Sequence, residues 1–236
     1  MPSLTPNMNN QKVRLWGLIG AAIATVALWQ IPGGNYILYP FTILATWFHE
    51  MAHGLMAFAM GGTFQKLVIF SNGSGMAYYS GPLFFEPIST VLVAAAGPMG
   101  PPLAGASFIM ASRNSKASSI ILKSLGIFLL FSALLWVRSL FGFVAVVILG
   151  AAVFAISFIK SEGTRNFAVQ FIGVQACVAT YLQIGYLFSY SADPMGISDT
   201  GRIQQILFLP YWFWGALIVV GSIFLLIASL RFAYRS

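Results

Sequence analysis

Hydrophobic residues fill long runs along most of the chain, and polar residues gather in short intervals between these runs. A helix needs about 20 mostly apolar residues to cross the hydrocarbon core of a bilayer. Candidate spans are Val13–Ile31, Tyr36–Met60, Pro87–Ala111, Ser118–Val137, Leu140–Ile159, Phe167–Tyr190 and Leu207–Leu230. The alternation of apolar and polar residues that a membrane β-barrel requires is missing. The pattern therefore predicts an all-α polytopic membrane protein, built as a single domain over residues 1–236.

The number of transmembrane helices depends on the third segment. Its centre reads Gly97-Pro98-Met99-Gly100-Pro101-Pro102. Each proline lacks an amide proton and clashes with the preceding helical turn. We expect a kink or break here unless neighbouring elements satisfy the freed carbonyls. The segment either crosses the membrane or re-enters it, and six to seven transmembrane helices result.

Two polar intervals are more than simple connections. In the first, β-prone runs at Gln65–Phe70 and Met76–Ser80 flank the Asn72-Gly73 pair. An Asn-Gly pair between such runs is a strong signal for a β-hairpin, which we expect to be small and associated with the membrane. The second interval, Ser189–Gln205, contains two of the five acidic residues of the chain.

Composition supports the membrane assignment. Hydrophobic residues make up 58% of the chain and charged residues only 7%, whereas a soluble domain is about one quarter charged. The net charge of +7 comes from basic residues scattered singly or in pairs, as is common at membrane edges. Because no dense basic patch exists, we expect the lipid bilayer, and no nucleic acid, as a partner.

The segment His49-Glu50-Met51-Ala52-His53 has the HExxH spacing of a metal site. Residues four apart lie on one face of a helix, so His49 and His53 can direct two imidazoles at a single ion. Zinc binds imidazole nitrogen readily and leaves positions for a further ligand and a water. Glu50 is then placed to act as the acid/base that takes a proton from this water.

The alternative is that these three side chains only hydrogen-bond to one another inside a helix bundle. A charged or strongly polar residue in the bilayer interior costs at least ~2.5 kcal/mol on insertion scales. His49 and His53 are also the only histidines in the chain. Three groups that are each costly to place in the bilayer interior lie on one helical turn, and a metal site explains all three.

A third ligand must come from elsewhere in the chain. The candidates are Glu86, Glu162, Asp193 and Asp199. The two glutamates lie near basic residues or at a span edge, which is typical of solvated interface charges. Asp199 is the preferred ligand and Asp193 the alternative. A helix-capping role for Asp199, or for Ser198 beside it, stays open.

The sequence around these residues resembles the site-2 protease-like intramembrane zinc metalloproteases, in particular their compact bacterial branch. The resemblance rests on four stretches: Phe48–Gly54 followed by Gly61-Gly62, the hairpin through Asn72–Gly75, the run Ala96–Pro101, and Ser198–Arg202 with Pro210. It implies a multi-pass protein of a bacterial cell membrane that hydrolyses membrane-embedded or membrane-adjacent peptide substrates.

The resemblance also implies roles for individual residues. His49, His53 and an aspartate would bind Zn²⁺, Glu50 would be the acid/base, and the hairpin would present the substrate as an added strand. Better-known members carry an Asn close after the Gly-Pro motif, where Gly100 and Pro101 stand here. The donor that faces the oxyanion is therefore not named by the sequence.

Two other functions compete with the protease hypothesis. A membrane transporter or metal carrier would bind an ion in passing, and it would favour further ionisable residues along a path through the membrane. The chain supplies few of these. A catalytically inactive, protease-like binding protein is the third possibility, although all three chemical residues are retained. The oligomeric state is left open.

Overall fold

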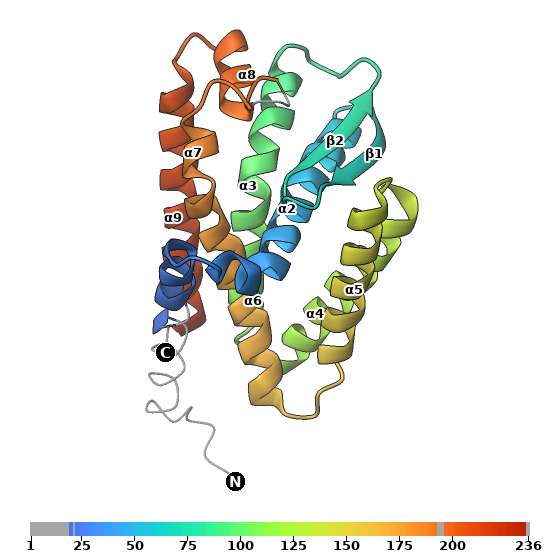
Figure 1. Cartoon of the computed structure of the whole chain (residues 1–236), viewed down its shortest axis with the longest axis vertical. Helices are drawn as coiled ribbons and strands as arrows, with labels where there is room; N and C mark the ends of the chain where they lie inside the picture. The colour runs from blue at the N-terminus through green and yellow to red at the C-terminus, as the bar shows by residue number, and fades with distance from the viewer. Residues whose placement is uncertain (1–18, 21, 193–195, 235–236) are drawn as a thin grey trace.

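Helices dominate the computed structural model, which describes residues 19–20, 22–192 and 196–234. After a helical stretch at residues 22–30, the elements are α2 (Gly34–Ala59), β1 (Thr63–Ile69), β2 (Gly75–Ser80), α3 (Ile88–Ala111), α4 (Ser115–Leu135), α5 (Leu140–Ile156), α6 (Glu162–Leu182), α7 (Ile184–Leu187), α8 (Asp199–Ile206) and α9 (Tyr211–Tyr234). The predicted helical architecture with one small hairpin is confirmed (Figure 1).

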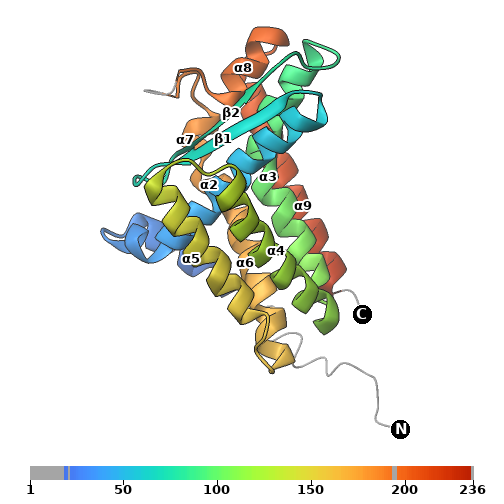
Figure 2. The same cartoon turned by 90° about the vertical axis from the view of Figure 1, so that its right-hand side faces the viewer.

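The helices pack around α2 and α3. α3 packs against α2, α6 and α9, while α4 and α5 pair with each other. The largest buried apolar cluster joins α2, the hairpin, α4 and α5, with Trp47 and Leu67 fully enclosed. The hairpin and α8 lie at the same end of the molecule in both views (Figures 1 and 2). The site described below lies at this end, between the hairpin and α8.

Three of the described helices, α3, α4 and α9, are both long and apolar enough to cross a membrane. α5 is apolar but has only 17 residues. α2 and α6, with 26 and 21 residues, are long enough but less apolar, because each carries polar residues in its interior. The first predicted span, Val13–Ile31, lies partly outside the described residues. The three apolar helices indicate a membrane protein.

Several helix ends differ from the predicted ones because capping groups decide them. α4 begins at Ser115, ahead of the predicted Ser118, since the Asn114 side chain accepts hydrogen bonds from two amides of the first turn. α6 likewise begins early, after the N-cap Ser161. The predicted sixth span is also not one helix, because it is interrupted at Gln183 before α7 begins.

The third predicted segment forms one helix without the break that was expected unless neighbouring elements satisfied the freed carbonyls. Pro98, Pro101 and Pro102 all lie inside α3 and are buried. α3 packs closely against α2 and α6, and neighbouring helices are what can satisfy carbonyls that proline frees. A Cβ on Gly100 would press into Ala52 and the Phe48 carbonyl of α2. The small residues of this segment therefore let two helices approach closely.

The hairpin is built as its sequence predicts. Asn72 accepts a hydrogen bond from the Ser74 amide (3.0 Å), and Gly73 has a φ of 87°, a conformation that glycine adopts without strain. Two side chains of α2 fix the turn: Tyr39 donates to the Ser71 carbonyl and Thr46 donates to the Gly73 carbonyl, both at 2.6 Å. The hairpin is thus held along α2.

The two outer edges of this small sheet have different neighbours. The outer edge of β1 is covered by the connection between α4 and α5: the Leu67 amide donates to the Trp136 carbonyl (2.8 Å), and the Arg138 amide donates to the Leu67 carbonyl (2.9 Å). The Ser139 hydroxyl also bonds the backbone of Ile69. The outer edge of β2 faces α2 and the cavity instead.

Candidate metal centre

α2 supplies three polar side chains of the site from a single helical turn. His49 and Glu50 are buried, at 6% and 8% exposure, and His53 is half-buried. The helical spacing of four places the Nε2 atoms of His49 and His53 only 3.1 Å apart. α3 can lie against this turn because it presents Gly97 there, where any Cβ would collide with the His53 ring.

His53 is held in a defined orientation. Its Nδ1–H donates a hydrogen bond to the Val93 carbonyl of α3 at 2.7 Å. A donor bond from one ring nitrogen leaves the other nitrogen unprotonated and available to a metal. Nε2 of His53 is the atom that faces the other ligand candidates. The ring therefore has the tautomer and direction that a metal ligand needs.

Asp199 reaches the histidines from the start of α8. Ser198 is the N-cap of this helix, and its hydroxyl accepts a hydrogen bond from the Gly201 amide (3.1 Å). Thr200 donates to the Leu187 carbonyl (3.0 Å) and so ties α8 to α7. Because Ser198 performs the capping, the Asp199 carboxylate is free to face α2. It lies 3.1 Å from Nε2 of His49 and 3.3 Å from Nε2 of His53.

The three side chains fit a zinc ion. Ligand atoms at about 2.0–2.2 Å from a tetrahedral zinc lie roughly 3.3–3.6 Å from one another. One ligand atom each from His49, His53 and Asp199 can be chosen so that all lie within 4.8 Å, and the shortest separations are 3.1–3.3 Å. Burial would raise the pKa of Asp199, but the charge and hydrogen bonds of protonated imidazoles lower it well below its usual range, and zinc binding would displace those protons. The site thus offers two nitrogens and one anionic oxygen.

Glu50 lies beside this cluster without joining it. Its Oε2 accepts a hydrogen bond from the Ala77 amide of β2 at 2.7 Å. A bond to one carboxylate oxygen fixes the group and leaves the second oxygen able to accept a proton. Gly75 of β2 lies so close to Glu50 and Thr46 that a Cβ there would collide with both. The hairpin therefore positions Glu50.

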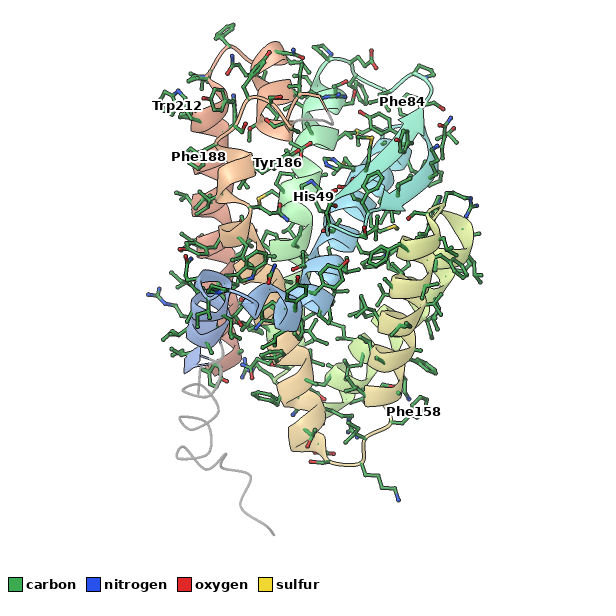
Figure 3. The ribbon with its side chains drawn as sticks, in the orientation of Figure 1. His49, Phe84, Phe158, Tyr186, Phe188 and Trp212 are labelled. Atoms are coloured by element: carbon green, nitrogen blue, oxygen red, sulfur yellow. The ribbon has the colours of Figure 1, made fainter. Side chains whose placement is uncertain are left out.

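A cavity of about 530 Å³ opens onto these residues. One wall is formed by α2 and the hairpin, including Glu50 and Ala77. The facing wall comes from α7, α8 and the segment before α8, including Tyr186 and Arg202. Figure 3 shows His49 and Tyr186 next to each other in this region. The cavity has room for water beside these side chains.

The other predicted candidates are not part of the cluster. Glu86 and Glu162 are exposed, and Glu162 accepts a hydrogen bond from Ser115 at the far end of α4. Asp193, the alternative third ligand, lies outside the described residues. Tyr186 lines the cavity but was not singled out from the sequence. It lies in an apolar run next to the end of a predicted span, and no local signal marks it.

The site combines two imidazoles, a facing carboxylate and an adjacent glutamate among apolar helices. This combination is typical of membrane metallohydrolases. A family model described as Peptidase M50B-like matches residues 18–229. The chain belongs to this family of metallopeptidases, and the resemblance to site-2 protease-like enzymes is thereby confirmed. No curated protein and no solved structure matches the chain.

Proposed function

We propose that this chain is a zinc-dependent intramembrane endopeptidase, which cleaves peptide bonds in or next to the membrane-embedded segments of its substrates. The observation that carries the proposal is the convergence of His49, His53 and Asp199 beside Glu50 in one cavity. Membership in a metallopeptidase family supports it. The cavity also contains an exposed strand edge, which a carrier for a bare ion does not need.

Each residue of the site would have its own role in peptide hydrolysis. His49, His53 and Asp199 would hold the zinc ion, which when bound polarises the scissile carbonyl and acidifies water. Glu50 takes one proton from the attacking water and later gives it to the leaving nitrogen, so that the peptide bond breaks without a free amide anion. The Ala77 amide keeps Glu50 oriented throughout these transfers.

The β2 edge is suited to hold the substrate. The Ala77 amide points away from β1, and backbone groups alternate sides along a strand, so Gly75 and Tyr79 also present theirs on the outer edge. A helical substrate has its carbonyls hydrogen-bonded and shielded. Pairing an unwound substrate segment with β2 would expose one carbonyl beside Glu50.

Substrate pairing predicts a periodic sensitivity to N-methylation. A single-span test peptide methylated on alternate amides beside the scissile bond is expected to be cleaved about 2- to 10-fold more slowly per lost strand bond, since each bond contributes about 0.5–1.5 kcal/mol. The same peptide methylated on the intervening amides serves as the control and should be cleaved nearly normally. Cleavage rates measured in detergent micelles decide the matter, and equal rates for both peptides would contradict strand pairing.

The membrane arrangement forms part of the proposal. α2 has 26 residues and extends about 39 Å at 1.5 Å per residue, more than the ~30 Å of a hydrocarbon core. α6 is also long enough to cross, and its polar residues face protein: Gln170 and Gln175 are buried. We therefore count α2, α6 and the shorter α5 with the three apolar helices, giving six spans in a bacterial cell membrane, and the predicted span Val13–Ile31 would be a seventh.

Metal removal tests the proposed activity directly. Purified protein in lipid vesicles is expected to cleave single-span test peptides, to lose all measurable cleavage on chelation, and to regain it when zinc is added. Cleavage by metal-free protein would contradict the proposal. Zinc movement across the vesicle membrane without cleavage would indicate a carrier, and peptide binding without cleavage would indicate an inactive binding protein.

A further inference from the structure

The cavity wall opposite Glu50 contains a tyrosine that the chemistry above does not use. Tyr186 belongs to the short helix α7, which follows the interruption of α6 at Gln183. Its ring centroid lies 6.2 Å from that of His49, at an interplanar angle of 73°. The backbone amide of Asp199 donates a hydrogen bond to the Tyr186 hydroxyl at 3.1 Å. Tyr186 thus lies next to two of the three ligand candidates, with its ring beside His49 (Figure 3) and its hydroxyl beside Asp199.

The bond to Asp199 leaves the hydroxyl with a proton to donate. A phenol carries one proton and accepts bonds through its oxygen lone pairs. The Asp199 amide uses a lone pair, and the Asp199 carboxylate is close enough to accept the phenolic proton. When that carboxylate binds zinc, the proton of Tyr186 becomes available to a ligand in the cavity. The same amide fixes where the phenolic oxygen lies. A fixed donor is what stabilises a developing charge efficiently, because no reorganisation is needed when the charge appears.

Three other hydroxyl donors of the cavity wall are already engaged, and a fourth, Tyr79, lies on β2, on the same wall as Glu50. Thr46 donates to the Gly73 carbonyl (2.6 Å), Thr42 to the Leu38 carbonyl (3.4 Å), and Ser74 to the Asn72 side chain (2.7 Å). Arg202 also lines the cavity, but its side chain is exposed and it lies beyond Asp199 along α8. Among these donors, Tyr186 is the one that contacts a ligand residue.

The two walls place different groups beside the substrate. Glu50 is fixed to β2 on one wall, where it would activate water. The carbonyl that zinc would polarise lies beside the ligands, and Tyr186 contacts His49 and Asp199 from the wall of α7 and α8. We propose that the Tyr186 hydroxyl donates a hydrogen bond to the oxyanion formed on the scissile carbonyl, and this inference rests on the proposed peptidase function.

The step balances without consuming Tyr186. Water oxygen forms a bond to the carbonyl carbon, and the electron pair of the C=O π bond moves onto oxygen. Glu50 holds the proton that the water gives up. When the C–N bond breaks, the oxygen pair re-forms the C=O bond, and Glu50 delivers its proton to nitrogen. Tyr186 keeps its own proton and only lowers the energy of the charged intermediate.

The test compares Tyr186→Phe with Tyr190→Phe. The first variant keeps the ring beside His49 and removes only the hydroxyl. The second removes a hydroxyl that accepts from Gln205 outside the cavity. Loss of one oxyanion donor is expected to lower kcat by about 10²–10³-fold, with KM and zinc affinity unchanged. Tyr190→Phe is expected to cleave as the wild type does.

A binding measurement separates this role from a structural one. A phosphinic peptide imitates the tetrahedral oxyanion, so its affinity for zinc-loaded Tyr186→Phe should fall by a factor similar to that in kcat. Weakened zinc binding with kcat restored by excess zinc would overturn the proposal, because Tyr186 would then only position Asp199. The proposal would also be overturned if Tyr186→Phe left kcat and the phosphinic-peptide affinity unchanged. The same holds if both quantities fell in Arg202→Gln and not in Tyr186→Phe. If the wild type cleaves no peptide, the proposed function fails, while phosphinic-peptide affinities still decide the role of Tyr186.

Discussion

Glu50→Gln is expected to lower peptide cleavage by about 10²–10⁴-fold while the protein still binds zinc. Glutamine has nearly the shape of glutamate, and its side-chain oxygen can still accept the Ala77 amide bond. It cannot take a proton from water at neutral pH, so the general-base contribution disappears. The measurement is the single-turnover cleavage rate of a test peptide, together with the zinc content of the same sample.

Glu162→Gln is the matched control for this variant. Glu162 is exposed and bonds only Ser115 at the opposite end of the molecule, so its amide should leave the cleavage rate within about 2-fold of the wild type. If Glu50→Gln retained full activity, Glu50 would have no part in the mechanism. If it lost zinc as well as activity, Glu50 would belong among the metal ligands instead.

Gly97→Ala is expected to weaken zinc binding strongly, although it adds only one methyl group. The new Cβ would overlap the His53 ring, so either the ring turns away or α3 moves back from α2. Displacing a ligand or its orienting partner typically costs 10–100-fold in metal affinity. The Val93 carbonyl bond to His53 also comes from α3, so both possible responses weaken the site. Zinc titration followed by fluorescence should show the loss, with a matching fall in cleavage at limiting zinc.

Gly163→Ala provides the comparison. Gly163 is also helical, but nothing lies within 4 Å of a Cβ placed on it. Alanine is a better helix former than glycine by about 1 kcal/mol, so this variant should be neutral or slightly more stable. Equal zinc affinity in Gly97→Ala and Gly163→Ala would show that close packing of α3 does not position His53.

The sequence predicted those features that depend on local spacing. The pairing of His49 and His53 follows from the helical repeat, and the hairpin turn follows from Asn72 and Gly73. Helix ends were less predictable, because a single side chain such as Asn114 or Ser161 moves a boundary that hydropathy leaves loose. Apolar content shows that a segment is buried, but it does not show where backbone hydrogen bonding begins.

Features that depend on contacts between distant segments were harder to predict. The continuity of α3 through its prolines results from packing against α2 and α6, which no local pattern records. The contact of Gly97 with His53 has the same origin. The sequence left capping by Asp199 or Ser198 open, and the structure places Ser198 as the cap of α8. Tyr186 had no comparable neighbour and emerged only from its position in the cavity.

Zinc content of purified protein tests the central claim most directly, if the wild type is compared with Asp199→Ala under a fixed free-zinc concentration. The wild type should bind one zinc per chain, because two imidazoles and a carboxylate converge within ligand distance. Asp199→Ala should bind zinc at least ~10-fold more weakly, since it retains only two of the three protein ligands. Equal zinc occupancy in both proteins at every free-zinc concentration would contradict this account of the site.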